Sequence, residues 1–335
     1  MNTPKERIYG AIAGADIDRI PCAPMMIRFA AARNGIKLRD YFLDGNIFAE
    51  CQMKAAEDFN LDAILLASEP TRIAHDLGGR VIYPENGIPH CEGPVITASS
   101  DLNDLTLPDM GKNSRMGDLL KAVEALVKHN SGARSICGWA DAPFAEACNL
   151  ITVEGMMMQM VDDESFARKL LEYTTKIATR FLKAQIELGV DLIAIGDAAA
   201  SLISPDMYKE FVYPYEKRII DTIHSLGIPV KLHMCGANNA KLGLIAKTGV
   251  DILNVDQNTD IRLARETAPN LCFKGNLDPV SILLQGSPDT VYAEAVKLTM
   301  AIGPRKYILS GGCELVPDTP AENLRALVAA GMESK

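Results

Sequence analysis

The sequence predicts an α/β protein built as a (β/α)8 barrel, the TIM-barrel architecture, with an elaborated N-terminal region. Eight short apolar runs have the length of buried strands, and most connections between them are long enough to hold a helix. No Gly-x-Gly-x-x-Gly turn follows any of these runs, which disfavours a doubly wound open sheet. With 335 residues and no linker or repeat, the chain is expected to form one barrel domain over 1–335.

Each predicted strand is an apolar run that ends at a turn or polar residue. The runs cover 21–27, 62–67, 133–140, 191–197, 229–235, 252–256, 271–278 and 307–313. Helical patterning predicts helices over 3–13, 38–59, 114–129, 153–188 (in one or two pieces), 205–226, 239–247, 261–267, 288–302 and 320–330. Residues 78–98 are rich in Gly, Pro and β-branched residues, which predicts a hairpin insertion.

Composition excludes several classes of function. The net charge of −9 argues against a nucleic-acid partner. No apolar run reaches the roughly 18–20 residues that span a bilayer, and the polar N-terminus has no apolar segment of a signal peptide behind it. The eight cysteines are scattered along a long chain, so we expect a reduced, cytoplasmic protein without disulfides. A monomer and a homodimer are both compatible with these features.

His233 and Cys235 stand at the end of the predicted strand 229–235, directly before Gly236. Side chains alternate along a strand, so residues two apart share a face. An imidazole and a thiol side by side form half of a zinc site. The pair also has a plain structural explanation, because a cysteine in a strand is most often a small buried hydrophobe.

Cys313 supplies the third ligand of this hypothesis. It follows two glycines at the end of the last predicted strand, and the ends of parallel barrel strands meet at one rim. One His and two Cys leave a fourth position open, as in catalytic zinc sites. These ligands suit zinc better than magnesium or calcium. His233, Cys235 and Cys313 are therefore predicted as zinc ligands and as the catalytic residues.

Other polar side chains at predicted strand ends are candidates for the same rim. Asp256 and Glu314 are predicted as a fourth ligand or as partners of the ligands. For Asp197 and Asp256, an acid/base role and simple capping of the following loop both stay open. The candidates for the substrate pocket are Arg28, Glu69, Trp139, Asp197 and Asn276.

Four segments resemble the uroporphyrinogen decarboxylase superfamily, in the same order and over nearly the whole chain. They are 18–24 (DRIPCAP), 204–215 (SPDMYKEFVYPY), 275–279 (GNLDP) and 319–327 (TPAENLRAL). The resemblance implies the barrel fold. Within the superfamily, His-x-Cys followed far downstream by Cys is typical of the zinc-dependent corrinoid methyltransferases, and His233, Cys235 and Cys313 match that pattern.

Departures from the decarboxylase pattern make porphyrinogen decarboxylation the weaker alternative. Decarboxylases usually have Gly-His-Gly where this chain has 312–314 (GCE). Their segment with two arginines is matched here by Arg28 and Arg33, with the second out of register. Their aspartate after the second strand is replaced by Ser68 and Glu69.

The methyltransferase resemblance implies Zn²⁺ as cofactor and a methylcobamide carried by a partner corrinoid protein. The implied acceptor is a small thiol such as coenzyme M, with tetrahydrofolate as another possible acceptor. The alternatives left open are transfer in the reverse direction and a non-catalytic corrinoid-binding or metal-binding protein.

Overall fold

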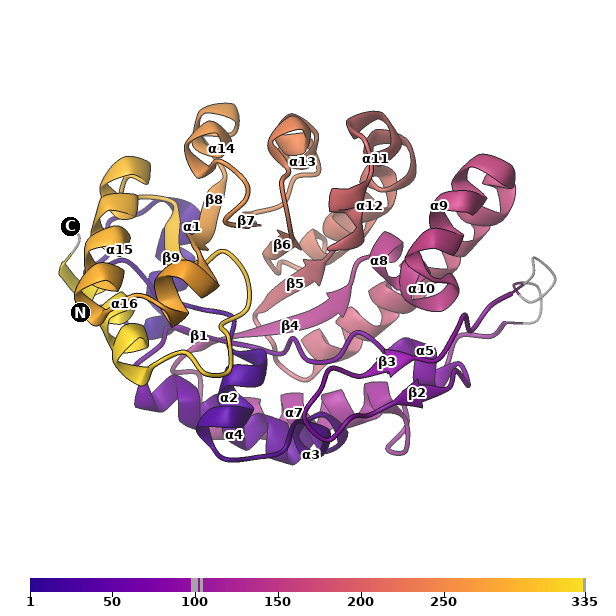
Figure 1. Cartoon of the computed structure of the whole chain (residues 1–335), viewed down its shortest axis with the longest axis horizontal. Helices are drawn as coiled ribbons and strands as arrows, with labels where there is room; N and C mark the ends of the chain where they lie inside the picture. The colour runs from indigo at the N-terminus through magenta and orange to yellow at the C-terminus, as the bar shows by residue number, and fades with distance from the viewer. Residues whose placement is uncertain (98–101, 103–104, 334–335) are drawn as a thin grey trace.

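Seven parallel strands form the curled sheet at the centre of the molecule. The computed structural model describes residues 1–97, 102 and 105–333. The sheet order is β1-β4-β5-β6-β7-β8-β9, and every pairing in it is parallel. The strands are β1 (Ala63–Leu65), β4 (Ser135–Asp141), β5 (Leu192–Gly196), β6 (Val230–Met234), β7 (Ile252–Val255), β8 (Cys272–Leu277) and β9 (Tyr307–Gly311) (Figure 1). The predicted barrel class is confirmed.

The eighth barrel position is occupied by an irregular segment, which corrects the predicted strand over 21–27. Cys22 and Met25 make isolated parallel bridges to Leu309 and Glu314, and Asp62 N donates to Cys22 O on the other side. Pro21 and Pro24 have no N–H to donate to a ladder, so a regular strand cannot form there. The segment nevertheless lies between β9 and β1 and closes the ring.

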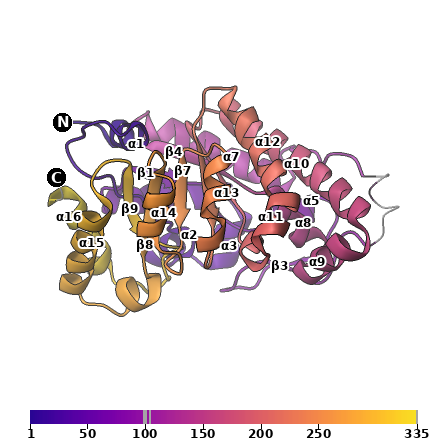
Figure 2. The same cartoon turned by 90° about the horizontal axis from the view of Figure 1, so that it is seen from above.

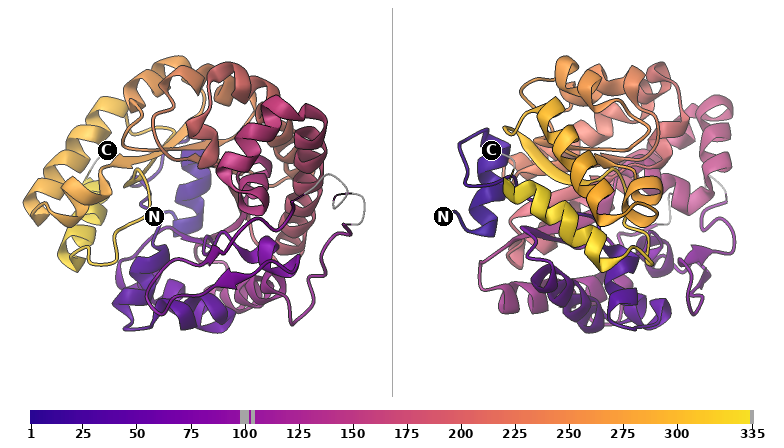
Figure 3. Two further views of the ribbon diagram at one scale, coloured as in Figure 1. Left: turned by 45° about the vertical axis from the view of Figure 1, so that its right-hand side comes forward. Right: turned by 60° about the vertical axis from the view of Figure 1, so that its left-hand side comes forward.

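Helices surround the sheet, as Figures 2 and 3 show. They are α1 (Pro4–Ala13), α2 (Ile27–Arg33), α3 (Leu38–Leu43), α4 (Gly45–Asp58), α5 (Arg72–Asp76), α7 (Arg115–Asn130), α8 (Pro143–Ile151), α9 (Val153–Asp162), α10 (Glu164–Glu187), α11 (Pro205–Phe211), α12 (Tyr213–His224), α13 (Leu242–Lys247), α14 (Ile261–Thr267), α15 (Pro288–Ile302) and α16 (Ala321–Glu333). Short helical turns follow β5 (η1, Ala199–Leu202), β6 (η2, Asn239–Lys241) and β8 (η3, Pro279–Leu284). None of the helices in the described residues is both long enough and apolar enough to cross a membrane.

Three predicted helices are interrupted. The prediction over 38–59 divides at Asp44, whose carboxylate caps α4 by accepting from Asn46 N and Ile47 N. The stretch 205–226 divides at Val212. The stretch 153–188 forms the two pieces α9 and α10, an arrangement the sequence allowed. The helices α2, α5 and α8 are additional to the prediction.

The predicted hairpin is present as β2 (Val81–Ile82) paired antiparallel with β3 (His90–Cys91). Residue 98, the last of the predicted insertion, lies outside the described residues.

Helix α1 covers the N-terminal end of the barrel. Its residues Ile8 and Ala11 are buried in one apolar cluster with Leu65, Leu192 and Ile308 from the strands. The N-terminal end is thereby filled, which leaves the C-terminal ends of the strands for a substrate site, as is usual for this architecture.

Candidate metal centre and substrate cavity

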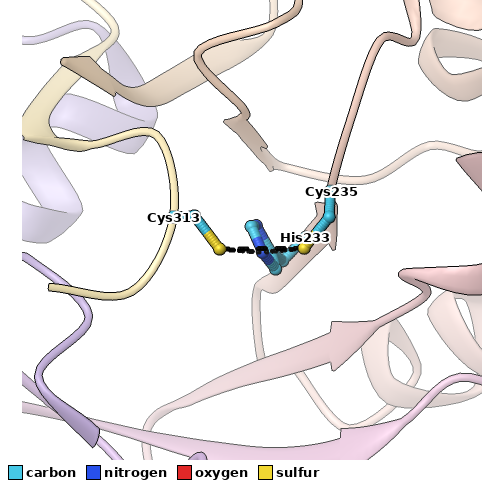
Figure 4. Close-up of side chains that lie close together, drawn as sticks. All are labelled: His233, Cys235 and Cys313. Carbon is cyan, nitrogen blue, oxygen red and sulfur yellow. Dashed lines mark hydrogen bonds between the residues drawn. The ribbon is translucent and has the colours of Figure 1, made fainter. Parts of the chain in front are cut away.

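His233, Cys235 and Cys313 meet at the C-terminal rim of the barrel (Figure 4). His233 Nε2 lies 3.1 Å from Cys235 Sγ and 3.8 Å from Cys313 Sγ. The two sulfurs are 3.7 Å apart, and both cysteines are free thiols. His233 belongs to β6, Cys235 directly follows that strand, and Cys313 follows β9.

The spacing of these atoms fits a shared tetrahedral metal ion. Zn–S and Zn–N bonds of about 2.3 and 2.0 Å would place two sulfurs about 3.8 Å apart, and a sulfur and a nitrogen about 3.5 Å apart. The observed sulfur separation of 3.7 Å matches this value, and the two nitrogen–sulfur distances of 3.1 and 3.8 Å lie on either side of theirs. Two thiols and an imidazole are also the donor set that zinc prefers.

The two thiols share their protons unequally. The hydrogen bond with Cys235 and the neighbouring His233 imidazole lower the pKa of the Cys313 thiol to about 4, although burial opposes them. The same hydrogen bond, together with burial, raises the pKa of Cys235. The pair therefore holds one proton more tightly on Cys235, and Cys313 carries negative charge readily.

Asn238 holds the turn that carries Cys235. Its Nδ2 donates to the backbone oxygens of Met234, Cys235 and Gly236 at 3.0–3.3 Å. Gly236 has φ of +79°, a left-handed conformation that favours glycine. Asn238 is 4% exposed, so its amide fixes the position of the thiol from inside the fold. Sequence reasoning did not single it out; its only signal was an amide shortly after a strand end.

A cavity of about 440 Å³ opens beside His233, Cys235 and Cys313. His233, Cys235, Cys313 and Glu314 form one wall. The other lining side chains are mostly apolar or small: Met25, Ile27, Pro70, Trp139, Asp141, Ala145, Cys148, Asn149, Val153, Gly196, Ala198, Ala199, Ser201 and Leu202. The predicted pocket residue Trp139 lies in this wall, and its ring crosses Gly196, where a Cβ would lie 2.3 Å from it.

Asp141 is a polar residue of the cavity lining that sequence reasoning left out of the site. Trp139 Nε1 donates to its Oδ1 at 3.3 Å, and Asn149 Nδ2 donates to its Oδ2 at 3.0 Å. Burial raises the pKa of Asp141 to about 7, against the two hydrogen bonds. Asp141 directly follows the predicted strand 133–140 and stands two residues after Trp139, which was a usable signal. Asn149 comes from the unpredicted helix α8.

Arg28 and Glu314 form an ion pair at the edge of the cavity. Glu314 Oε1 accepts from Arg28 N at 2.7 Å and from Arg28 Nε at 3.0 Å. Glu314 lines the cavity and Arg28 does not. The Glu314 carboxylate therefore holds α2 against the loop after β9, and it does not join the group of metal-ligating atoms.

The Asp256 side chain accepts hydrogen bonds from the loop that follows it. Its Oδ1 accepts from Asn258 N and from Asn258 Nδ2, both at 2.8 Å. The predicted pocket residue Asn276 supports the same loop, because its Nδ2 donates to the backbone oxygens of Asp256 and Thr259. Neither residue lines the cavity, so the capping alternative accounts for Asp256, and Asn276 supports the loop instead of the pocket.

Glu69 and Asp197 lie behind the cavity wall. Glu69 accepts from Arg115 at 2.8 Å and lies 3.6 Å from Arg72 in a buried ion network. Asp197 is fully buried, and burial beside the Glu216 carboxyl raises its pKa well above the usual range. Both side chains can act on the site only through the residues in front of them.

Comparison with known proteins places the chain in one family. The uroporphyrinogen decarboxylase (URO-D) family matches residues 3–333. The methylcobamide:CoM methyltransferase MtbA of Methanosarcina acetivorans is 30% identical over 99% of this chain and 98% of its own length. A uroporphyrinogen decarboxylase of Trichlorobacter lovleyi is 26% identical over 96% of both chains.

A solved methyltransferase from Methanosarcina mazei has the same fold, with a TM-score of 0.89, 24% identity and 98% of both chains covered. The family match extends over almost the whole chain, and the fold agrees with it. The chain belongs to the uroporphyrinogen decarboxylase (URO-D) family.

Proposed function

We propose that this protein transfers a methyl group between a methyl-corrinoid and a thiol, using zinc held by His233, Cys235 and Cys313. Within its family the chain is a methyltransferase: methyltransferases match it at 30% identity over its whole length. The observation that carries the proposal is the meeting of one imidazole and two free thiols within 4.8 Å at the mouth of the barrel. A decarboxylase has no use for such a donor set.

The chemistry needs a thiolate, because a free thiol has a pKa of about 8.5 and is mostly protonated at neutral pH. Zinc, when bound, would supply the thiolate by lowering the pKa of a thiol that it binds. Cys235 and Cys313 contribute negative charge, which keeps sulfur in this site electron-rich. The apolar cavity excludes water and holds the acceptor's carbon chain beside the ligands.

In the reaction, the acceptor sulfur forms a bond to the methyl carbon while the cobalt–carbon bond breaks. The electron pair of that bond remains on cobalt, and the thiol proton leaves to solvent. No oxidant or reductant is consumed, and the same steps run backwards transfer the methyl group from a methylated thiol to a reduced corrinoid.

An apolar groove next to the cavity is our candidate for the seat of the corrin ring. The groove, of about 810 Å³, lies along α9 and shares Val153 and Leu202 with the cavity. Met158, Val161 and Leu202 are 53%, 77% and 65% exposed there. Exposed apolar surface of this kind commonly marks an interaction site, and a corrin bound there would adjoin the cavity that holds the acceptor.

The test is methyl transfer by the purified protein from methylcobalamin to 2-mercaptoethanol and other small thiols. We expect about one zinc per chain and turnover that stops on chelation and returns with zinc. Zinc-independent decarboxylation of uroporphyrinogen would favour the decarboxylase alternative. Bound zinc without transfer to any thiol or to tetrahydrofolate would favour a non-catalytic binding protein.

A further inference from the structure

The charge of the cavity wall restricts the acceptor. Among the described residues that line the cavity, none is Lys or Arg, whereas Asp141 and Glu314 are both acidic. A site for a sulfonate or carboxylate normally offers an arginine, a lysine or a free helix N-terminus. The lining of this cavity offers no such side chain.

Two cations that contact residues of the lining, Arg28 and Lys241, are already engaged. Arg28 points its Nε at both oxygens of Glu314, at 3.0 and 3.2 Å. Buried Lys241 donates to Ser201 O at 3.0 Å and lies 3.4 Å from Asn238 Oδ1, behind the wall. Their charges are balanced or turned away from the cavity.

The wall behind Asp141 adds further acidic groups. Glu146 and Asp197 are buried next to it, and Glu216 lies behind Asp197; none of these four carboxyls has a lysine or arginine ion-pair partner among the described residues. Asp141 also stands two residues before α8, where a carboxylate offsets the partial positive charge of the helix N-terminus. An anion placed in the cavity would lie beside the carboxyl groups of Asp141 and Glu314, with no lysine or arginine in the described lining to balance its charge, which is unfavourable.

Asp141 itself is built as an acceptor of hydrogen bonds. Each of its oxygens receives one donor, from Trp139 and from Asn149. A carboxylate has about four acceptor positions, so lone pairs remain for a group in the cavity. An ammonium or hydroxyl on the acceptor could bind this carboxyl group inside the cavity that His233, Cys235 and Cys313 also line.

We propose that the methyl acceptor is a small thiol without an anionic group, neutral or cationic, whose polar end binds at Asp141. This rests on the proposed methyl transfer to a thiol. It separates this chain from its relatives that are named for coenzyme M, since coenzyme M is 2-mercaptoethanesulfonate, an anionic thiol.

The experiment compares four thiols with the same two-carbon spacer and different ends. They are 2-mercaptoethanesulfonate, 3-mercaptopropionate, 2-mercaptoethanol and 2-aminoethanethiol, with methylcobalamin as donor. We expect kcat/KM for the neutral and cationic thiols to exceed that for both anionic thiols at least tenfold. Equal values, or a preference for an anionic thiol, would overturn the inference.

Binding of thiol-free analogues separates this inference from the methyl transfer itself. Ligand-observed NMR should detect ethylammonium in the cavity, displaced by 2-mercaptoethanol, and should detect ethanesulfonate at least tenfold more weakly. This readout needs no turnover. Absence of transfer to every thiol would therefore refute the proposed function, while tighter binding of ethanesulfonate would refute the charge preference alone.

Two variants test whether Asp141 is the residue responsible for the charge preference among thiols. In Asp141→Asn, the ratio of kcat/KM for 2-aminoethanethiol over 2-mercaptoethanol should fall at least fivefold. In Glu85→Gln, which removes a surface carboxylate that pairs with Lys37 and does not line the cavity, the ratio should stay as in the wild type. An unchanged ratio in Asp141→Asn would exclude that residue as the binding group. If that variant does not fold, the wild-type thiol and analogue series still decide the charge preference.

Discussion

The sulfurs of Cys235 and Cys313 lie 3.7 Å apart, although 78 positions separate the two residues in the chain. In sheet order, β6 and β9 are three steps apart, which would be about 14 Å in a flat sheet at about 4.8 Å per step. The sheet curls, and the loops after both strands turn inward, so the two sulfurs come much closer than they would in a flat sheet. The candidate metal centre is therefore brought together by barrel closure.

Loss of either thiol should abolish the metal site without unfolding the protein. We expect Cys235→Ser and Cys313→Ser each to weaken zinc affinity more than about 100-fold, because removal of a ligand exceeds the 10–100-fold effect of changing a ligand's partner. Competition with a chromophoric chelator measures this. Cys91→Ser, at a half-buried cysteine of the hairpin, is the matched control and should keep stoichiometric zinc. Retention of zinc by both ligand variants would contradict the assignment.

Gly312 allows the loop that carries Cys313 to pass close to the loop after β7. A Cβ at this position would lie 2.4 Å from Gln257 N and 3.0 Å from the carbonyl carbon of Asp256. Gly312→Ala should therefore push the loops apart, weaken zinc binding about tenfold and lower the free energy of unfolding by about 1–3 kcal/mol. Urea denaturation and chelator competition measure the two effects. Gly93→Ala, where a Cβ meets open space, should change neither.

Substitutions in the groove on α9 should weaken binding of the corrinoid and leave binding of the thiol unchanged. Met158→Lys and Val161→Lys each place a charge on exposed apolar surface, so we expect KM for methylcobalamin to rise about fivefold or more. KM for the thiol and the unfolding free energy should change little, since both side chains face solvent. Met300→Lys, at an 80% exposed methionine of α15, is the control. If all three variants behave alike in steady-state assays, the groove does not seat the corrin.

Buried acids should make the protein less stable as the pH rises. Burial raises the pKa of Glu216 to about 7, although the Tyr208 hydroxyl donates to it and opposes the shift. The unfolded value is about 4.3, so the folded state holds a proton that the unfolded chain releases, and stability is lost as the pH rises from about 4 to 7.

Between pH 5 and pH 8, the wild type should therefore lose on the order of 2 kcal/mol more stability than Glu216→Gln. Urea unfolding at the two pH values measures the difference. Glu85→Gln removes a surface carboxylate paired with Lys37 and should follow the wild type. A wild type that gains stability over this range relative to Glu216→Gln would contradict the burial argument.

Seven of the strands and the three candidate metal ligands could be named from the sequence alone because both depend on local patterns; that the three residues bind zinc stays a prediction. Seven of the eight predicted strands overlap strands of the sheet, since buried parallel strands are continuous apolar runs. The His-x-Cys pair follows from the two-residue period of β6, and Cys313 from its place at the end of β9. The prediction of a strand over 21–27 was wrong because it relied on the apolar composition of the segment. The two prolines in it have no N–H to donate to a neighbouring strand.

Only the tertiary structure decided which polar strand ends face the cavity. Arg28 and Glu314 are 286 positions apart and form an ion pair. Glu69 is buried in an ion network with Arg115 and does not line the cavity. Asp141 becomes the polar group of the cavity because Trp139 and an amide on α8 hold it there. A position at a strand end predicts that a side chain lies at the rim of the barrel. Which group that side chain contacts depends on how distant segments pack together, and the local sequence pattern does not contain that information.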